Sequence, residues 1–107
     1  MKCILLSSQG KHFTSGLSLK EPLYDQSDDV GVNALRLKAL VEHWQGAISL
    51  IRQCPVPVLV GIQGGCIGGG VDIITAGCIR FCTEKAFFSI KEIDIGIAAD
   101  IGTFPRI

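Results

Sequence analysis

The sequence lacks several features that would point to particular classes of protein. Ten Lys and Arg residues balance ten Asp and Glu residues, so no excess of positive charge favours nucleic-acid binding. No apolar stretch reaches the roughly 20 residues that a membrane-spanning helix needs. The first apolar run, Cys3 to Leu6, is too short for a secretory signal peptide. We therefore expect neither nucleic acid nor a membrane span among the partners of this chain.

Cysteine pairs and metal-ligand clusters are also missing. The chain has five cysteines, and an odd number without a secretory signal favours reduced thiols in an intracellular compartment. Cys78 and Cys82 are four residues apart, but no second pair or nearby histidine completes a zinc site. We expect buried thiols that behave as small apolar groups, and no bound metal.

What the chain has in quantity is hydrophobic residues, at 48%, and 13 glycines, with only 7% aromatic residues. This composition is typical of a buried α/β interior. Apolar residues three and four apart predict a helix from about Asn33 to Gln53, after a surface loop over residues 20–30. The other expected elements are a second helix from Gly69 or Gly70 to about Ala76, buried strands over residues 3–7 and 56–62, and further strands over residues 79–82 and 86–93. This order predicts an α/β layered fold.

The glycine-rich segment 64–72 is the most informative part of the sequence. It is not a Walker A loop, because no Gly-Lys-Ser/Thr follows. It is not a dinucleotide-binding motif either, because Ile73 stands where the third glycine would be. A glycine turn that opens a helix presents unpaired N–H groups and suits an oxyanion hole. Close packing between helix and strand would need the same glycines, and both interpretations remain open at this point.

Three acidic residues follow the glycines, and each has two possible roles. Asp72 would lie in the first turn of the second helix, where a carboxylate stabilises the positive helix end. Glu92 shares strand parity with Phe88 and Ile90, so it would point to the apolar side and suit proton transfer; alternatively it is a strand-end residue in solvent. Asp100 follows an apolar stretch, and its alternative role is a helix N-cap.

The motifs together resemble a known family. Residues 13–19 (Phe-Thr-Ser-Gly-Leu-Ser-Leu) and 55–72 (Pro-Val-Pro-Val-Leu-Val-Gly-Ile-Gln-Gly-Gly-Cys-Ile-Gly-Gly-Gly-Val-Asp) resemble the enoyl-CoA hydratase/isomerase (crotonase) superfamily. Residues 86–103 resemble one branch of it, the Δ3,5-Δ2,4-dienoyl-CoA isomerases. The resemblance covers essentially the whole chain and implies a crotonase-like (ClpP/crotonase) ββα superhelix.

The resemblance also implies the extent of the domain. Crotonase domains are about twice this length or more, so we expect residues 1–107 to be a partial crotonase domain. The N-terminal strand-helix unit and the C-terminal helical part would be absent. We expect the chemistry to be encoded here, but the chain alone to be poorly folded and inactive.

The loop Ser15 to Leu19 is expected to cradle coenzyme A, and the resemblance places two oxyanion donors. One is the N–H of Leu17 and the other is the N–H of Gly69. One residue departs from the family pattern: Ser18 stands where Asp is usual, which puts the rigidity of the loop in question. The resemblance thus assigns Ser15, Gly16, Leu17, Ser18, Leu19 and Gly69 to the binding of the acyl-CoA thioester.

The resemblance decides among the roles of the carboxylates. Hydratases of this family use two glutamates at the positions of Asp72 and Glu92, and typically have glycine at the position of Asp100. The pattern here resembles the dienoyl isomerases, with Asp100 as base, Glu92 returning the proton and Asp72 tuning the neighbouring acids. No metal or redox cofactor is implied, since coenzyme A is part of the substrate.

Two further functions stay open at this stage, an enoyl-CoA hydratase and an inactive crotonase-like module that acts through protein contacts. Full-length members of the family are homo-oligomers, trimers or hexamers, and work in mitochondrial or peroxisomal β-oxidation. Lys11 and Lys20 flank the coenzyme A loop and are candidates for contact with a phosphate. His12 is a weaker candidate for the same contact.

Overall fold

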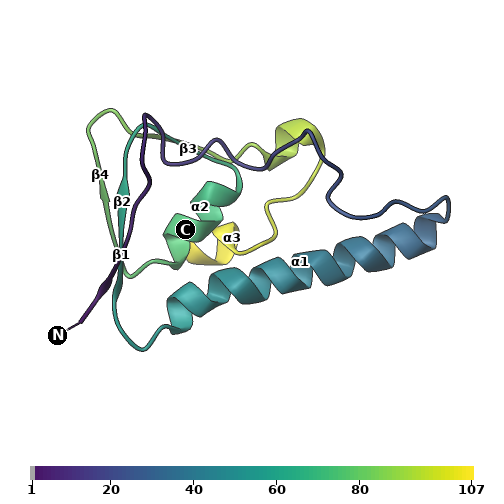
Figure 1. Cartoon of the computed structure of the whole chain (residues 1–107), viewed down its shortest axis with the longest axis horizontal. Helices are drawn as coiled ribbons and strands as arrows, with labels where there is room; N and C mark the ends of the chain where they lie inside the picture. Colours follow the sequence, from purple (N-terminus) through teal and green to yellow (C-terminus); the bar gives the residue numbers. More distant parts are fainter. Residues whose placement is uncertain (1) are drawn as a thin grey trace.

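The structure, a computed structural model, describes residues 2–107. Its elements in chain order are β1 (Ile4–Leu6), α1 (Val30–Gln53), β2 (Val58–Ile62), β3 (Gly65–Ile67), α2 (Gly69–Ala76), β4 (Ile79–Cys82), β5 (Phe87–Ser89), the 3-10 helix η1 (Glu92–Ile95) and α3 (Thr103–Arg106). Helix α1 extends well past the body formed by the strands, α2 and α3 (Figure 1). No helix within residues 2–107 has both the length and the apolar character to cross a bilayer.

The strands form two parallel sheets. The first has the order β1-β2-β4, with Leu59 beside Leu5 on one side and beside Ile79 on the other. The second pairs β3 with β5, with Cys66 beside Phe88. Parallel strands need crossover connections, and helices α1 and α2 provide them here. The α/β class expected from the sequence is therefore confirmed.

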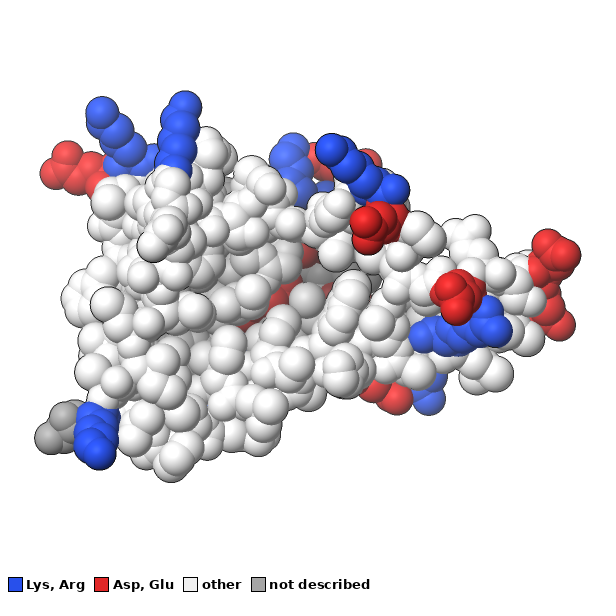
Figure 2. Space-filling view, in the orientation of Figure 1, with Lys and Arg blue, Asp and Glu red and all other residues white. Residues whose placement is uncertain are grey.

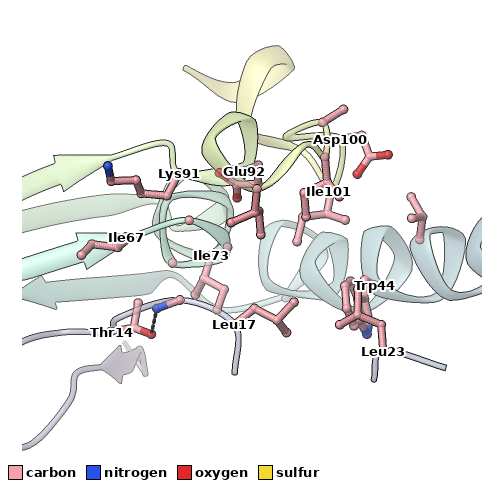
Figure 3. A pocket seen from close by; sticks show the side chains of 18 of the residues that line it. Thr14, Leu17, Leu23, Trp44, Ile67, Ile73, Lys91, Glu92, Asp100 and Ile101 are labelled. Carbon is pink, nitrogen blue, oxygen red and sulfur yellow. Dashed lines mark hydrogen bonds between the residues drawn. The ribbon is translucent and has the colours of Figure 1, made fainter. Parts of the chain in front are cut away.

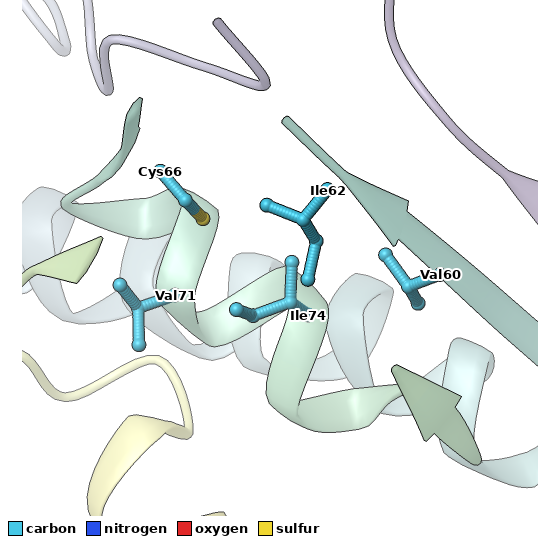
Figure 4. Packing of buried hydrophobic residues seen from close by; sticks show 5 residues of the cluster. All are labelled: Val60, Ile62, Cys66, Val71 and Ile74. Atoms are coloured by element: carbon cyan, nitrogen blue, oxygen red, sulfur yellow. The ribbon is translucent and has the colours of Figure 1, made fainter. Parts of the chain in front are cut away.

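The core lies between the three-stranded sheet and α2. In β2, Val58, Val60 and Ile62 are buried while the residues between them are only partly buried, because successive side chains on a strand point to opposite faces. The buried cluster contains Val60, Ile62, Cys66, Val71 and Ile74 (Figure 4). This core anchors the glycine segment, since Cys66 precedes it and Val71 and Ile74 follow it.

Two boundaries differ by three or more residues from those expected. Helix α1 begins at Val30 because Asp29 caps it: one Asp29 carboxylate oxygen accepts the N–H of Gly31 at 2.7 Å and that of Val32 at 3.2 Å. The expected helix end at Gln53 and the helix over residues 69–76 are confirmed. The strand expected over residues 86–93 was wrong beyond Ser89.

After β5 the chain turns instead of continuing as a strand. Gly96 adopts a left-handed conformation with φ 76°, and the N–H of Ile97 donates to the carbonyl of Glu92 at 3.0 Å. Glycine supplies this conformation without steric cost. The side chains of Lys91 and Asp94 pair across the same turn at 2.6 Å. These contacts close η1, so strand parity does not determine where Glu92 points.

The strand over residues 3–7 was expected to be buried, and this was wrong. Ile4 and Leu5 are 47% and 66% exposed, and Ile79 and Phe81 in β4 are also exposed. β1 and β4 are the two edge strands of the three-stranded sheet, so each has a neighbouring strand on one side only.

Candidate active site

A cavity of about 620 Å³ opens between α1, the loop after β1, the glycine segment and residues 91–101 (Figure 3). Its lining residues are Thr14, Ser15, Gly16, Leu17, Leu19, Leu23, Leu37, Val41, Trp44, Ala47, Ile48, Ile67, Gly68, Gly69, Gly70, Ile73, Lys91, Glu92, Ile95, Gly96, Ile97, Ala98, Asp100 and Ile101. Most of them are apolar. In the space-filling view the hollow is white apart from acidic atoms at its bottom (Figure 2).

The glycine segment serves both packing and access to the backbone. A Cβ on Gly70 would come within 2.1 Å of the Thr14 methyl and 3.2 Å of the Cys66 sulfur, so Gly70 is required for packing. Gly68 has φ 57° and precedes the first residue of α2, Gly69. The N–H of Gly69 donates to no group within residues 2–107, and Gly69 lines the cavity. The two interpretations of the glycines therefore apply to different glycines.

The loop over residues 15–19 is held against this segment. Thr14 bridges to β3: its N–H donates to the carbonyl of Gly65 at 3.1 Å, and its carbonyl accepts the N–H of Ile67 at 3.2 Å. The N–H of Gly16 donates to the Thr14 hydroxyl at 3.2 Å. A Cβ on Gly16 would lie 3.3 Å from the Ile67 carbonyl oxygen and 4.0 Å from the Gly68 Cα. The two loops thus meet, as the sequence predicted.

Four of the five residues expected to cradle coenzyme A line the cavity: Ser15, Gly16, Leu17 and Leu19. The N–H of Leu17, like that of Gly69, donates to no group within residues 2–107. Ser18 does not line the cavity, and its contact with coenzyme A stays a prediction. Residues of an irregular loop point in different directions, and its neighbours on both sides face the cavity instead.

Glu92 lies at the start of η1 and is only 9% exposed. One of its carboxylate oxygens lies 3.5 Å from where a Cβ on Gly68 would be. The other is buried, with no hydrogen-bond partner in the described chain. Glu92 therefore reaches the glycine turn, and its alternative as a solvent-exposed strand end was wrong.

Asp100 also lines the cavity, from the segment that follows η1. Its carbonyl accepts a hydrogen bond from the Gln45 side chain of α1 at 2.6 Å, and the preceding Ala99 is buried. Helix α3 starts at Thr103 after Gly102, so the alternative of Asp100 as an N-cap was wrong. In Figure 3 the side chain of Ile101 lies between Glu92 and Asp100.

Asp72 is not brought together with the other two acids. It is fully buried, but it does not line the cavity. One of its carboxylate oxygens accepts the Thr103 hydroxyl at 2.5 Å, and the other has no partner within residues 2–107. Asp72 lies in the first turn of α2, as expected, but it is buried and not at the surface. Thr103 lies 31 residues further along the chain, and nothing in the sequence marks it as a partner.

Helix α1 supplies one part of the apolar wall of the cavity. Leu37, Val41, Trp44 and Ile48 belong to the stripe that the sequence predicts, and no residue of α1 is fully buried. The stripe was correctly identified, but it faces the cavity as well as the core. Hydrophobic periodicity alone does not distinguish these two surroundings.

No group of three or more His, Cys, Asp or Glu side chains within residues 2–107 is arranged to hold a metal ion. The polar groups at the cavity include two carboxylates, of Glu92 and Asp100, and two unoccupied backbone N–H groups, of Leu17 and Gly69. Two N–H donors of this kind stabilise negative charge on a carbonyl oxygen, and carboxylates transfer protons.

Known proteins are similar to this chain in sequence and in fold. Residues 1–107 match the family model described as enoyl-CoA hydratase/isomerase. The chain is 46% identical over 110 residues to the mitochondrial Δ3,5-Δ2,4-dienoyl-CoA isomerase of Rattus norvegicus, covering 99% of this chain and 34% of that protein. It is 49% identical over 109 residues to the peroxisomal enzyme of that name from Arabidopsis thaliana, covering 97% and 39%. The chain therefore spans about a third of the length of these relatives.

Solved structures agree on the fold. An enoyl-CoA hydratase from Shewanella pealeana superposes with a TM-score of 0.73 at 24% identity, over 92% of this chain and 36% of that one. A protein from Thermobifida fusca solved in complex with acetoacetyl-CoA gives 0.79 at 21% identity, over 97% and 43%. These likenesses confirm the crotonase-like fold. With the family match over its whole length, they show that the chain belongs to the enoyl-CoA hydratase/isomerase family.

Proposed function

We propose that this chain carries the acyl-CoA-binding and proton-transfer site of an enzyme that isomerises 3,5-dienoyl-CoA to 2,4-dienoyl-CoA in fatty-acid β-oxidation. One observation carries the proposal: Glu92 and Asp100 line the same apolar cavity as Leu17 and Gly69, whose N–H groups are unoccupied. The names of the relatives from Rattus norvegicus and Arabidopsis thaliana support the same reaction.

The chemistry follows from these groups. The N–H groups of Leu17 and Gly69 would hold the thioester oxygen, where negative charge develops when the acyl chain loses a proton. Asp100 would take the proton from C2, and the electron pair would spread along the conjugated chain. Glu92 would deliver a proton to C6, which moves both double bonds by one position. This sequence of steps needs no metal or redox cofactor, and coenzyme A enters as part of the substrate.

The position of Asp72 favours isomerisation over hydration. A hydratase of the kind considered above would use carboxylates at positions 72 and 92 together on one water molecule. Asp72 bonds to Thr103 and does not line the cavity, whereas Asp100 does. The name of another relative supports the hydratase alternative: the chain is 34% identical over 99 residues to the cyclohexa-1,5-dienecarbonyl-CoA hydratase of Thauera aromatica. The reaction must therefore be tested directly.

The proposal extends to assembly and location. We propose that the whole protein forms homo-oligomers and that it acts in mitochondria or peroxisomes. The compartments follow those in the names of the Rattus norvegicus and Arabidopsis thaliana relatives, which are mitochondrial and peroxisomal.

The test uses the 107-residue chain and a chimaera in which it replaces the matching 110 residues of the Rattus norvegicus relative. 3,5-Octadienoyl-CoA is the substrate, and the absorbance of the conjugated product is followed. We expect turnover in the chimaera and none in the chain alone. Turnover by the isolated chain would refute its expected inactivity, while a folded chimaera without turnover would refute the assigned function.

Variants of the chimaera separate the candidate functions. Asp100→Asn should reduce isomerisation by at least about a hundredfold, the usual range for loss of a general base. Asp28→Asn, in the exposed loop before α1, is the matched control and should leave the rate unchanged. Hydration of a 2-enoyl-CoA that survives Asp100→Asn would favour the hydratase. Acyl-CoA binding without either reaction, together with co-purification of a longer relative, would favour the inactive module.

A further inference from the structure

We propose that His12 is a positioning residue for the acyl-CoA loop, and that it acts only while its imidazole is neutral. This inference rests on the proposed function for the identity of its ligand. His12 lies three residues before Ser15, the first residue of that loop, and it does not line the cavity described above. Its contacts with the glycine segment instead determine where the loop begins.

The imidazole of His12 accepts a hydrogen bond from the glycine segment. The N–H of Gly65 donates to Nδ1 of His12 at 2.8 Å, so this nitrogen carries no proton, and the proton of the neutral ring is on Nε2. The ring also meets Phe87 edge to face, with centroids 6.1 Å apart at 75°. A Cβ on Gly64 or Gly65 would lie only 2.7 Å or 3.3 Å from Nδ1. The paired glycines thus leave the space that the imidazole occupies.

Backbone hydrogen bonds of the next residues connect His12 to the acyl-CoA loop. The hydrogen bond of His12 is one rung of a series: the N–H of Phe13 donates to the carbonyl of Gln63 at 2.8 Å, and the Thr14 rungs to β3 follow. Thr14 then holds the N–H of Gly16 through its hydroxyl. The His12 hydrogen bond therefore helps to fix the position of residues 12–14 beside β3, and with it the start of the loop that brings Leu17 to the cavity.

Protonation of the His12 imidazole would remove its hydrogen bond with Gly65. A doubly protonated imidazole has two donors and no acceptor, so it cannot accept the N–H of Gly65. The ring is on the surface and borders a second hollow whose charged groups are Lys11, Glu84 and Lys85. Acidification should therefore break this rung and loosen the start of the loop.

Two variants of the chimaera separate this role from bulk and from charge. His12→Asn offers a side-chain oxygen near the place of Nδ1 and does not titrate. His12→Phe keeps a ring against Phe87 but has no acceptor. The first readout is the hydrogen-exchange protection of the Gly65 amide, with the imidazole ¹⁵N shifts of the wild type. We expect His12→Phe to lose about fivefold in protection and His12→Asn to retain it.

The second readout is the Kd for octanoyl-CoA at about pH 8 and about pH 5.5. At the lower pH, the wild type should bind octanoyl-CoA about fivefold more weakly than His12→Asn does. His12→Phe should bind it weakly at both pH values. The phosphates of coenzyme A titrate equally in all three comparisons, so only the difference between variants is assigned to His12.

Three outcomes would overturn the proposal. These are a Gly65 amide unaffected by His12→Phe, equal weakening of wild type and His12→Asn by acid, and tighter binding of the wild type at low pH. The last would mean that the charged ring contacts a phosphate. If the Gly65 amide responds as expected but wild type binds no acyl-CoA at either pH, the failure lies with the proposed function and not with the His12 contact.

Discussion

The Cys66 side chain is fully buried in the cluster of Val60, Ile62, Val71 and Ile74. Burial disfavours the charged thiolate, and it raises the pKa of the thiol from its ordinary value of 9.0 to about 11. Cys3, Cys78 and Cys82 are exposed. The sequence predicts buried cysteines that behave as small apolar groups. Of the five cysteines, Cys66 alone is fully buried in this way.

The raised pKa of Cys66 gives a prediction about reactivity and stability. Alkylation by iodoacetamide at about pH 8 should modify the three exposed cysteines first and Cys66 only through unfolding, because the thiolate is the nucleophile. The thiol form is favoured in the fold, so this contribution to stability is complete below pH 9 and is lost as pH rises towards 11. Peptide mapping checks the first part. Labelling of Cys66 as fast as Cys78 under native conditions would contradict it.

Glycines with different surroundings allow a matched pair of substitutions. Gly70→Ala should destabilise the chain by about 1–3 kcal/mol, because its Cβ would overlap Thr14 and press on Cys66. Gly46→Ala in α1, where nothing lies within 4 Å of the added atom, should instead be neutral or stabilise by up to about 1 kcal/mol. Urea unfolding of both variants checks the signs. Equal effects would mean that the contact between Thr14 and the glycine segment is not close.

Helices α2 and α3 are tied by a single buried hydrogen bond, between Thr103 and Asp72. The residues between η1 and α3 include Ile97, Ala98, Asp100 and Ile101 of the cavity wall. An anchor at Thr103 therefore limits how far Asp100 can move. We therefore expect Asp72 to act on the site through the backbone that carries Asp100, in contrast to the direct tuning of neighbouring acids that the family resemblance implies.

This connection predicts different results for two similar substitutions. Thr103→Val removes the hydroxyl at nearly constant volume and leaves a buried carboxylate oxygen unpaired, which costs about 1–3 kcal/mol. Thr103→Ser retains the hydroxyl and should lose less than half of that. In the chimaera Thr103→Val should also lower kcat more than it raises KM, since it misplaces Asp100 and leaves the N–H donors intact. A fall in stability with unchanged kcat would restrict Asp72 to a structural role.

The elements themselves differ in how well the sequence predicts them. Helix α2 and strand β2 were predicted closely, because glycine and proline positions mark their ends. The segment after Ser89 was assigned to a strand on its alternating apolar residues, yet the left-handed Gly96 and the Lys91–Asp94 pair close a turn there. Glu92 is buried, as expected, but the strand parity on which that expectation was based is wrong. The turn of η1 places Glu92 instead.

One face of the three-stranded sheet is covered and the other is not. Helices α1, α2 and α3 all lie on the same side of the sheet (Figure 1). The register places Leu5, Leu59, Ile79 and Phe81 together on the opposite face, and three of them are 50–66% exposed. Parallel sheets normally have both faces covered. We call these four residues the open face.

An open face of this kind predicts self-association of the isolated chain. Phe81→Lys should lower the apparent mass in light scattering towards that of a monomer, because it places a charge on the open face. Leu50→Lys, at an exposed leucine of α1 outside the cavity, is the control and should change the mass much less. Equal effects of the two, or a monomeric wild type, would show that the open face does not drive association.

The sequence by itself determined the α/β class, the glycine segment that opens a helix, the apolar stripe of α1 and the candidate acids. Local spacing specifies these features, because helix and strand periods and glycine conformations depend on neighbouring residues. Only the tertiary structure decided that Glu92 and Asp100 share a cavity while Asp72 bonds to Thr103. It also decided that Ser18 does not line the cavity and that His12 accepts the Gly65 N–H. These contacts join residues up to 53 positions apart, and packing alone determines which distant side chains meet.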